Sequence, residues 1–271
     1  MFRKIVISLL LLLSISACQK EWEPNLITDI NDLQGRRVGV NLSWESDYIL
    51  TGRKDMELFR YDSTADMILA LGYDKIDAIC MDEMMWKLME NYSSGLIRIE
   101  PDVKKTSYIW VFNDEKLRNE FNEFLKEFKK TDDYAAFVKR EKEYDGDYVD
   151  PGLPLTGNGR KLRVAFDVGG YPRSFFNPGD SDPKGFDFEP LIYFANAKNY
   201  QLEPVGTVYD DAMLGIRTGN YDLSGGYTST EYAPEIEALG LYVSDPMDEI
   251  PIFFVQKTSR EMSVDLAALE E

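Results

Sequence analysis

The sequence predicts an α/β protein made of two lobes, each with a parallel sheet. One observation is an internal repeat, because "DMILALGYDKIDAI" (66–79) and "DAMLGIRTGNYDLS" (211–224) align without a gap. Another is that a similar strand precedes each copy, "RRVGVNLS" (36–43) and "LRVAFDVG" (162–169). A β–α–β order that occurs twice favours two α/β units with parallel strands. The alternative is a chance likeness between two short α/β segments.

Each copy of the repeat has three parts with different hydrophobic patterns. A short amphipathic helix comes first, and a turn follows it at Gly72 in one copy and at Gly219 in the other. An aspartate, Asp77 or Asp222, then leads into an apolar run that is typical of a buried strand.

The composition fits two modest lobes and excludes several functions. A chain of 271 residues that is 44% hydrophobic and 13% aromatic can bury a substantial core. With 30 Lys and Arg against 48 Asp and Glu, the net charge is −18. Such a surface repels phosphate backbones, so no nucleic acid partner is expected. The sequence has no histidine, which excludes Ser-His-Asp and Cys-His catalysis and His-ligated zinc.

The first residues, "MFRKIVISLLLLLSISAC", have the organisation of a lipoprotein signal peptide (1–17). A basic start leads into an apolar run too short to span a bilayer comfortably, and small residues precede Cys18. We expect cleavage before Cys18 and a lipid on its sulfur. An ordinary secretory signal or an N-terminal anchor helix are the alternatives. Residues 18–27 would then form a polar tether, and removing Arg3 and Lys4 takes the net charge from −18 to −20.

Cys80 is the only other cysteine, and it lies in the apolar stretch "IDAICM". With Cys18 acylated, Cys80 has no partner for a disulfide. We interpret it as a small buried core residue, and we expect no metal site and no cofactor.

The middle of the chain predicts a strand, two helices and a linker. "YIWVF" (108–112) is a strand, and "NDEKLRNEFNEFLKEFKK" (113–130) is strongly amphipathic with a regular apolar face. Residues 132–144 continue helically. The stretch 145–161 then combines prolines and glycines without apolar periodicity, which predicts a linker. Its "GNG" lacks the Lys-Ser/Thr and the strand–helix setting of a phosphate loop.

The carboxyl ends of the predicted strands carry the candidate binding residues, because α/β sheets bind ligands just beyond those ends. These ends are "VNLSWES" (40–46), "CMDE" (80–83), "FDVGGYP" (166–172) and "GGYTST" (225–230). They offer carboxylates, hydroxyls, aromatic rings and glycines, which suit a small polar ligand. Each has a structural alternative: Asp82, Thr228 and Thr230 could cap helices, Tyr171 and Trp44 could be core aromatics, and Tyr209 could be a hydrophobic staple.

With these segments placed, the chain resembles family 3 solute-binding proteins, the amino-acid-binding type of ABC importers, over about residues 30–258. "INDLQGRRVGV" (30–40), "DKIDAICMDE" (74–83) and residues 108–140 resemble segments of the family's second lobe and its closing helices. "LRVAFDVGGYPRSFF" (162–176) and "VYDDAMLGIRTGNYDLSGGYTST" (208–230) resemble its first lobe. The resemblance therefore implies a two-lobed, periplasmic-binding-protein-like (type II) clamshell whose lobes are circularly permuted.

The implied division of the chain follows from this order. The second lobe would comprise residues 28–112, and the first lobe 113–145 and 155–258. Residues 146–154 would be a linker and 259–271 a C-terminal tail. Strands near Ile109–Phe112 and Phe253–Gln256 would cross the hinge.

The resemblance also implies a ligand shell. In the family's positions an acid and stacking aromatics hold the ligand, and a loop of the second lobe closes over it. One departure is clear, because Ala233 stands where the family has an arginine that grips the α-carboxylate; Arg173, close in sequence to Tyr171, is a candidate substitute. The implied ligand-binding residues are Asp82, Asp167, Tyr171, Tyr209, Gly226, Thr228, Asn41, Ser43, Trp44 and Arg173.

The expected function is therefore that of a monomeric lipoprotein, not an enzyme, in the periplasm or on the cell surface. It would bind a small polar solute (amino-acid-like, an amine or a small peptide) between its lobes, for transport with an ABC permease. One alternative is a sensory or scaffold lipoprotein with the same fold. The other is a peptidoglycan-related regulatory domain without its catalytic partner. The two carboxylates of Asp82 and Asp167, without an arginine at Ala233, favour a donor-rich ligand that needs no free α-carboxylate.

Overall fold

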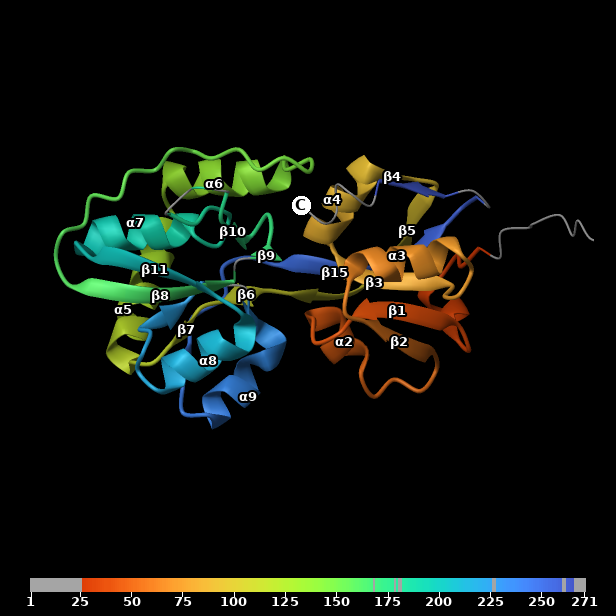
Figure 1. The fold of residues 1–271 in the computed structure, drawn as a ribbon, viewed down its shortest axis with the longest axis horizontal. Helices are drawn as coiled ribbons and strands as arrows, with labels where there is room; N and C mark the ends of the chain where they lie inside the picture. Colours follow the sequence, from red (N-terminus) through yellow and green to blue (C-terminus); the bar gives the residue numbers. More distant parts are fainter. Residues whose placement is uncertain are drawn as a thin grey trace, which may run out of the picture.

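Two five-stranded sheets organise the chain in the computed structural model (Figure 1). The structure describes residues 26–167, 169–177, 179, 182–225, 228–259 and 262–265. The strand orders are β2–β1–β3–β15–β5 and β11–β8–β12–β7–β14. In each sheet the first three strands are parallel, and the fourth is antiparallel to both of its neighbours. The predicted α/β class is confirmed, but the sheets are mixed where parallel sheets were expected.

Lobe A, built on the first sheet, has helices on both faces (Figure 1). Because successive strand residues point to opposite faces, Cys80 packs with Leu50 of α2 while Met81 packs with Ile68 of α3. Burial on both faces explains why this strand reads as a continuous apolar run. The elements of lobe A are η1 (Ile30–Leu33), β1 (Arg37–Asn41), α2 (Glu45–Leu50), β2 (Glu57–Tyr61), α3 (Thr64–Gly72), β3 (Ala78–Asp82), α4 (Glu83–Tyr92), β4 (Ser93–Ser94), β5 (Leu96–Thr106), β15 (Ile250–Lys257) and β16 (Ser263–Val264).

Lobe B has α5, α6 and α7 on one face of its sheet and α8 and α9 on the other. Phe121 on the apolar face of α5 is fully buried, with its ring 5.0 Å from Trp110 and 5.1 Å from Phe194. The elements of lobe B are β6 (Tyr108–Ile109), β7 (Val111–Phe112), α5 (Glu115–Phe128), α6 (Asp132–Lys142), β8 (Lys161–Asp167), β9 (Gly169–Gly170), β10 (Ser174–Phe175), α7 (Glu189–Lys198), β11 (Gln201–Thr207), α8 (Tyr209–Arg217), β12 (Leu223–Ser224), β13 (Thr228–Ser229), η2 (Thr230–Tyr232), α9 (Ala233–Ala238) and β14 (Tyr242–Val243).

The two copies of the repeat occupy equivalent places in the two sheets. The strand that ends each copy, β3 or β12, pairs in parallel with the strand that precedes it, β1 or β8. The repeated aspartate makes the same contact in both: Asp77 Oδ2 accepts the Arg37 N–H, and Asp222 Oδ2 accepts the Arg163 N–H, each at 2.8 Å. The aspartate therefore ties the helix–strand turn to the neighbouring parallel strand in each lobe.

The turn in the first copy lies at a different residue from the one expected. Gly72 is the last residue of α3, and the left-handed position is Asp74, with a φ of 57°. Asp74 aligns with Gly219, whose φ is 76°. Aspartate tolerates this conformation better than most residues, so the turn needs no glycine there.

The chain crosses between the lobes near Ser107, after β5, and again between β14 and β15. These crossings differ from the expected hinge and lobe boundaries. Val111–Phe112 pair within the sheet of lobe B, and Ile250–Lys257 pair within the sheet of lobe A. In both lobes the crossing segment supplies the fourth, antiparallel strand, a long-range pairing that local patterns do not reveal.

The segment expected to be a linker is held against lobe B. Residues 143–160 contain no helix or strand, yet side chains fix them at several points. The Tyr171 hydroxyl donates to the Gly146 carbonyl at 2.8 Å and accepts the Tyr148 N–H at 2.9 Å. Further along, Asn196 donates to the Pro154 carbonyl at 2.8 Å. We call residues 145–156 the strap.

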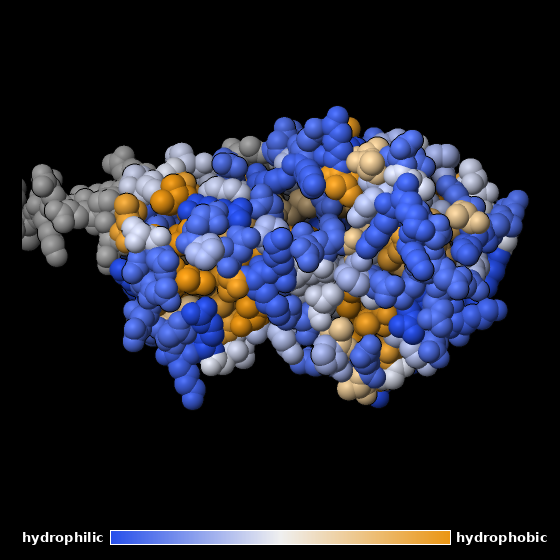
Figure 2. All heavy atoms as spheres, turned by 180° about the vertical axis from the view of Figure 1, so that it is seen from behind, coloured by the Kyte–Doolittle hydropathy of each residue, from blue (hydrophilic) through white to orange (hydrophobic). Residues whose placement is uncertain are grey.

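The predicted signal peptide and Cys18 lie outside the described residues, as do the end of the tail (266–271) and most of the tether. Within the described residues no helix is long and apolar enough to cross a bilayer. Cys80 is buried, as expected, and is a free thiol. The surface seen in Figure 2 is mostly hydrophilic, with apolar patches on both lobes.

Candidate functional site at the lobe junction

Asp82, at the carboxyl end of β3, points into the junction between the lobes. Its side chain is buried and caps α4 by accepting the Met85 N–H at 2.7 Å. It also accepts the Tyr108 hydroxyl at 3.1 Å, and Tyr108 belongs to β6 beyond the crossing. The helix-capping interpretation of Asp82 is therefore confirmed, and the same carboxylate links lobe A to the hinge.

Glu45 is the second acid at this point, and it is buried in the first turn of α2. Its side chain hydrogen bonds to Asp82. Burial, together with the Asp82 carboxylate, raises the pKa of Glu45 to about 8. At neutral pH Glu45 is therefore mainly protonated and donates to Asp82. The Asp82 carboxylate thus has three donors from the chain itself: Met85, Tyr108 and Glu45.

Arg173 of lobe B approaches Tyr108 from the other side. Its guanidinium lies 3.8 Å from the centre of the Tyr108 ring. Arg173 is paired with Asp187 at 2.6 Å and with Glu141 at 3.3 Å, and is 8% exposed. Burial lowers the pKa of Arg173, but the carboxylates of Asp187 and Glu141 outweigh it and raise the pKa well above its usual value. Arg173 was a candidate to bind the carboxylate of a ligand, but its guanidinium is already paired with two acids of the chain.

Acids outnumber bases in this cluster, which we call the junction network. Burial raises the pKa of Asp187 to about 6 and that of Glu141 well above its usual value. Glu141 also hydrogen bonds to Asp248, and one oxygen each of Asp187 and Asp248 is buried without a hydrogen-bond partner among the described residues. The cluster thus contains five carboxyl groups and one guanidinium, and the raised pKa values of Glu45 and Glu141 mean that part of the acids hold protons at neutral pH. The junction network consists of Glu45, Asp82, Tyr108, Glu141, Arg173, Asp187 and Asp248.

Contacts on both flanks of the junction network hold the lobes together. On one flank, Lys87 of α4 donates to the Lys142 carbonyl at the end of α6, at 2.6 Å. On the other, the Tyr232 hydroxyl donates to the Ser43 carbonyl at 2.8 Å, and its ring lies 4.9 Å from Tyr48. The structure therefore represents a closed arrangement of the lobes.

The predicted residues of lobe A lie at this edge but have other contacts. Asn41 is buried and donates to the Thr64 hydroxyl at 2.8 Å. Ser43 has a φ of 63°, and its N–H donates to Asp47. Trp44, at the start of α2, is 42% exposed and offers its ring to solvent.

The predicted residues of lobe B are more dispersed. Tyr171 packs on Phe175 and binds the strap through its hydroxyl, so it acts as a structural aromatic. Tyr209 is half-buried at the start of α8. Thr228 is 2% exposed, and its hydroxyl has no hydrogen-bond partner among the described residues. Gly226 and the side chain of Asp167 lie outside what the structure describes.

Of the seven residues of the junction network, the sequence reasoning identified Asp82 and Arg173 and missed the other five. Glu45 sits in "WES" directly after β1 and Tyr108 sits in the strand "YIWVF", so both were visible in segments already singled out. Nothing in the sequence indicates that Glu141 and Asp187 converge on Arg173, because α6 and the start of α7 meet only in the fold. Among the described residues no group of three or more acids or cysteines is arranged to hold a metal ion.

No family model and no curated protein sequence matches the chain. Solved structures that it resembles include the periplasmic aliphatic sulphonate-binding protein of Escherichia coli, with 12% identity and a TM-score of 0.43 over 83% of this chain and 65% of that one. A probable amino-acid ABC transporter extracellular-binding protein of Bacillus subtilis has 8% identity and a TM-score of 0.43, over 88% of both chains. An ATP phosphoribosyl transferase complex of Thermotoga maritima has 11% identity and a TM-score of 0.34, over 82% and 88%. These resemblances are remote, and the architecture described above rests on the strand orders themselves.

Proposed function

We propose that the protein is a cell-envelope receptor that closes two lobes on a small polar solute and delivers it to an ABC permease. The observation that carries the proposal is the meeting of both lobes at strand ends. Asp82 from lobe A and Arg173 from lobe B contact the same side chain, Tyr108, which lies at the crossing. Ligands of α/β sheets bind at this edge of the strands, and hinge closure can enclose a solute there.

We further propose that Cys18 carries the lipid that anchors this receptor to a membrane, and that the lobes stand in permuted order relative to the solute-binding proteins they resemble. The motif "ISAC" after an apolar run supports the anchor. The order of the family-like segments along the chain supports the permutation. A lipid mass on the mature N-terminus is expected, and an unmodified Cys18 thiol there would contradict the anchor.

The ligand we propose is rich in hydrogen-bond donors and needs no free carboxylate. Ala233 cannot grip an anion, and Arg173 is engaged by Asp187 and Glu141. The buried Thr228 hydroxyl is free of partners among the described residues and could bind a polar ligand group. Amines, amides and small peptides fit these conditions better than free amino acids.

A specific observation favours one rival, the sensory or scaffold lipoprotein. In the junction network, three donors of the chain hydrogen bond to Asp82, and two acids pair with Arg173. The chain itself thus makes the contacts that a bound ligand would otherwise make. In this alternative the lobes stay closed without a solute.

A thermal-shift screen with matched ligands tests the receptor. Amino acids are compared with their amides, amines and short peptides, and a ligand present at one hundred times its Kd should stabilise the protein by about 2.7 kcal/mol. We expect amides and amines to shift the melting temperature more than the free acids. Thr228→Val should weaken that binding, whereas Thr218→Val, which removes an exposed hydroxyl on lobe B, should not. A larger shift with the free acids would overturn the charge argument, and no shift with any compound would favour the scaffold.

A further inference from the structure

Two buried acids meet at the lobe junction without a cation of their own. Glu45 is 7% exposed and Asp82 is 5% exposed, and their side chains hydrogen bond to each other. Among the described residues no lysine or arginine forms a salt bridge with either of them. Arg173, the cation whose charge acts on Glu45, is paired with Asp187 and Glu141. Because two buried negative charges side by side repel each other, the two carboxyl groups hold one proton between them.

Lobe B covers Glu45 where η2 packs against α2. The Tyr232 hydroxyl donates to the carbonyl of Ser43, which precedes Glu45, and the Tyr232 ring centre lies 4.9 Å from that of Tyr48, which follows it. Glu45 and Tyr48 are three residues apart and therefore lie on the same face of α2. Burial and then the charge of Glu45 raise the pKa of Tyr232, so the two side chains are near each other.

Asp82 is covered in the same way by groups beyond lobe A. The Tyr108 hydroxyl donates to it at 3.1 Å, and the guanidinium of Arg173 lies 3.8 Å from the centre of the Tyr108 ring. Contact between the lobes therefore contributes to the burial of both acids. When the lobes separate, Glu45 and Asp82 return to water and ionise as ordinary carboxyl groups.

The other titratable groups around this pair are either paired or neutral. Three acids on the surrounding elements have cationic partners: Asp47 pairs with Arg60, Glu83 with Arg98 and Glu231 with Lys104. Burial raises the pKa of three further groups, which stay neutral: Cys80, Tyr108 and Tyr232. Asp187 and Glu141 also have raised pKa values, but both pair with Arg173 inside lobe B. Glu45 is therefore the acid whose charge changes near neutral pH where α2 meets η2.

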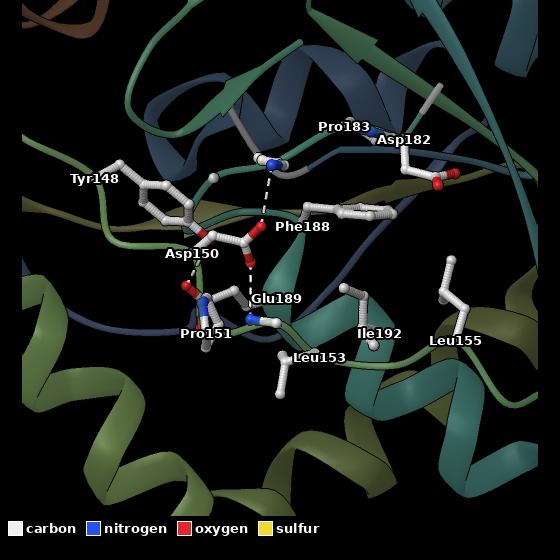
Figure 3. A pocket seen from close by; sticks show the side chains of 13 residues that line it. Tyr148, Asp150, Pro151, Leu153, Leu155, Asp182, Pro183, Phe188, Glu189 and Ile192 are labelled. Atoms are coloured by element: carbon white, nitrogen blue, oxygen red, sulfur yellow. Dashed lines mark hydrogen bonds and ion pairs between the residues drawn. The ribbon is translucent and has the colours of Figure 1, made fainter. Parts of the chain in front are cut away.

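Lobe B presents a rigid surface to the two acids. Beside a cavity of about 270 Å³ beneath the strap, the Tyr148 hydroxyl donates to Glu189 at 2.9 Å and fixes the strap to the start of α7 (Figure 3). Just before this helix, a Cβ on Gly185 would lie 2.2 Å from the Arg173 carbonyl oxygen. Because Arg173 is held so closely, it has little room to turn toward an ionised Glu45. Separation of the lobes is the movement that gives Glu45 water instead.

We propose that the Glu45–Asp82 pair is a proton-binding site that couples closure of the lobes to pH. A proton from water binds to the pair when the lobes close, and it returns to water when they open. This inference rests on the proposed closure of the lobes, and it adds that a lower pH favours the closed form.

The direction of the effect follows from the state of Glu45 in the two forms. In the closed form its pKa is about 8, against an ordinary value of 4.5 for a glutamate in water. Between these values the closed form keeps a proton that the open form has released. Each rise of one pH unit should therefore lower the ratio of closed to open molecules by up to about tenfold. The preference for the closed form is greatest below pH 4.5 and is lost as the pH rises to about 8.

The distance between the lobes at pH 5 and at pH 8, measured without any solute, tests the coupling. Spin labels are placed at two exposed positions, Lys54→Cys in lobe A and Arg217→Cys in lobe B, in the full chain carrying Cys18→Ser. We expect the short distance to dominate at pH 5, and the ratio of long to short distances to rise at least about tenfold at pH 8. Glu45→Gln should keep the short distance at both pH values, because its amide can donate to Asp82 but cannot ionise. Glu57→Gln, at an exposed position of β2, should respond to pH like the wild type.

Carboxyl ¹³C NMR of the wild type measures the proton itself. The glutamate signal that is absent from Glu45→Gln should titrate well above the ordinary range of a glutamate, and titration within that range would overturn the proton site. An interlobe distance that stays the same between pH 5 and pH 8 would overturn the coupling, as would a Glu45→Gln variant that opens like the wild type. If an amide or amine from the thermal-shift screen still shortens a distance that pH does not change, the receptor proposal stands without the coupling. A distance that neither pH nor these compounds change contradicts both.

Discussion

Replacing Arg173 by alanine should destabilise the protein by about 3–5 kcal/mol, the usual effect of removing one partner from a buried ion pair. Asp187 is fully buried, and Glu141 is nearly so at its side chain; both would lose the guanidinium that compensates their charge. The Tyr108 ring would also lose its cation. Urea unfolding of the variant and the wild type measures the effect as a lower midpoint.

A matched control separates this effect from the loss of any arginine. Arg53 pairs with Asp55 at a more exposed place in lobe A, so Arg53→Ala should cost less than about 1 kcal/mol. Methylguanidinium should restore part of the stability of Arg173→Ala, because it can occupy the vacated place between Asp187 and the Tyr108 ring. It should not stabilise the wild type or Arg53→Ala. Equal losses of unfolding free energy in Arg173→Ala and Arg53→Ala would show that the junction network contributes little to stability.

The free energy of unfolding should fall as the pH rises from 5 to 8. The pKa of Glu45 is about 8 in the folded chain against an ordinary value of 4.5, and the pKa of Asp187 is about 6 against 3.8. Between these limits the folded chain keeps protons that the unfolded chain has released, so a higher pH favours unfolding. For Glu45 the loss begins near pH 4.5 and is complete above pH 8. No histidine titrates in this range to obscure it.

The variant Glu45→Gln isolates the contribution of Glu45. Its amide can still donate to Asp82 but cannot ionise, so the variant should be close to the wild type at pH 5 and more stable at pH 8. A pKa shift of one unit between the unfolded and folded chain corresponds to about 1.4 kcal/mol of unfolding free energy. The difference in stability between Glu45→Gln and the wild type at pH 8 should therefore be easy to measure. Glu57→Gln, at an exposed position of β2, serves as the control and should keep the wild-type pH profile. A Glu45→Gln variant with the wild-type slope would contradict a protonated Glu45.

The repeated units were predictable because their signals are local. Helix amphipathicity, the turn and the aspartate before a buried strand all lie within one stretch of sequence, and Asp77 and Asp222 make the same backbone contact in the two lobes. The fourth strand of each sheet was not predictable in this way, because β7 and β15 join strands far away in sequence. The expected lobe boundaries were displaced for that reason.

In the candidate site, too, the local features were predictable from the sequence and the long-range contacts were not. Asp82 was identified because it follows a buried strand and precedes a helix. For Tyr171 the alternative of a core aromatic agrees with its packing on Phe175, but the contacts of its hydroxyl were not predictable, because the strap looks like a featureless linker in the sequence. The partners of Arg173 are Glu141 on α6 and Asp187 just before α7, and their approach depends on the whole of lobe B. Local patterns therefore indicate which edge of a sheet matters, while the tertiary fold decides which side chains remain available to a ligand.

The distance between the lobes in solution tests the central claim, that the two lobes move relative to each other and close on a solute. Spin labels at Lys54→Cys in lobe A and Arg217→Cys in lobe B, both exposed positions, report this distance. Cys18→Ser removes the proposed lipid-bearing cysteine, and Cys80, the other cysteine of the sequence, is buried. The account predicts a long and a short distance in the free protein, with a shift toward the short one when a ligand from the thermal screen is added. A single distance that no stabilising ligand changes would contradict it and assign the fold to a permanently closed scaffold.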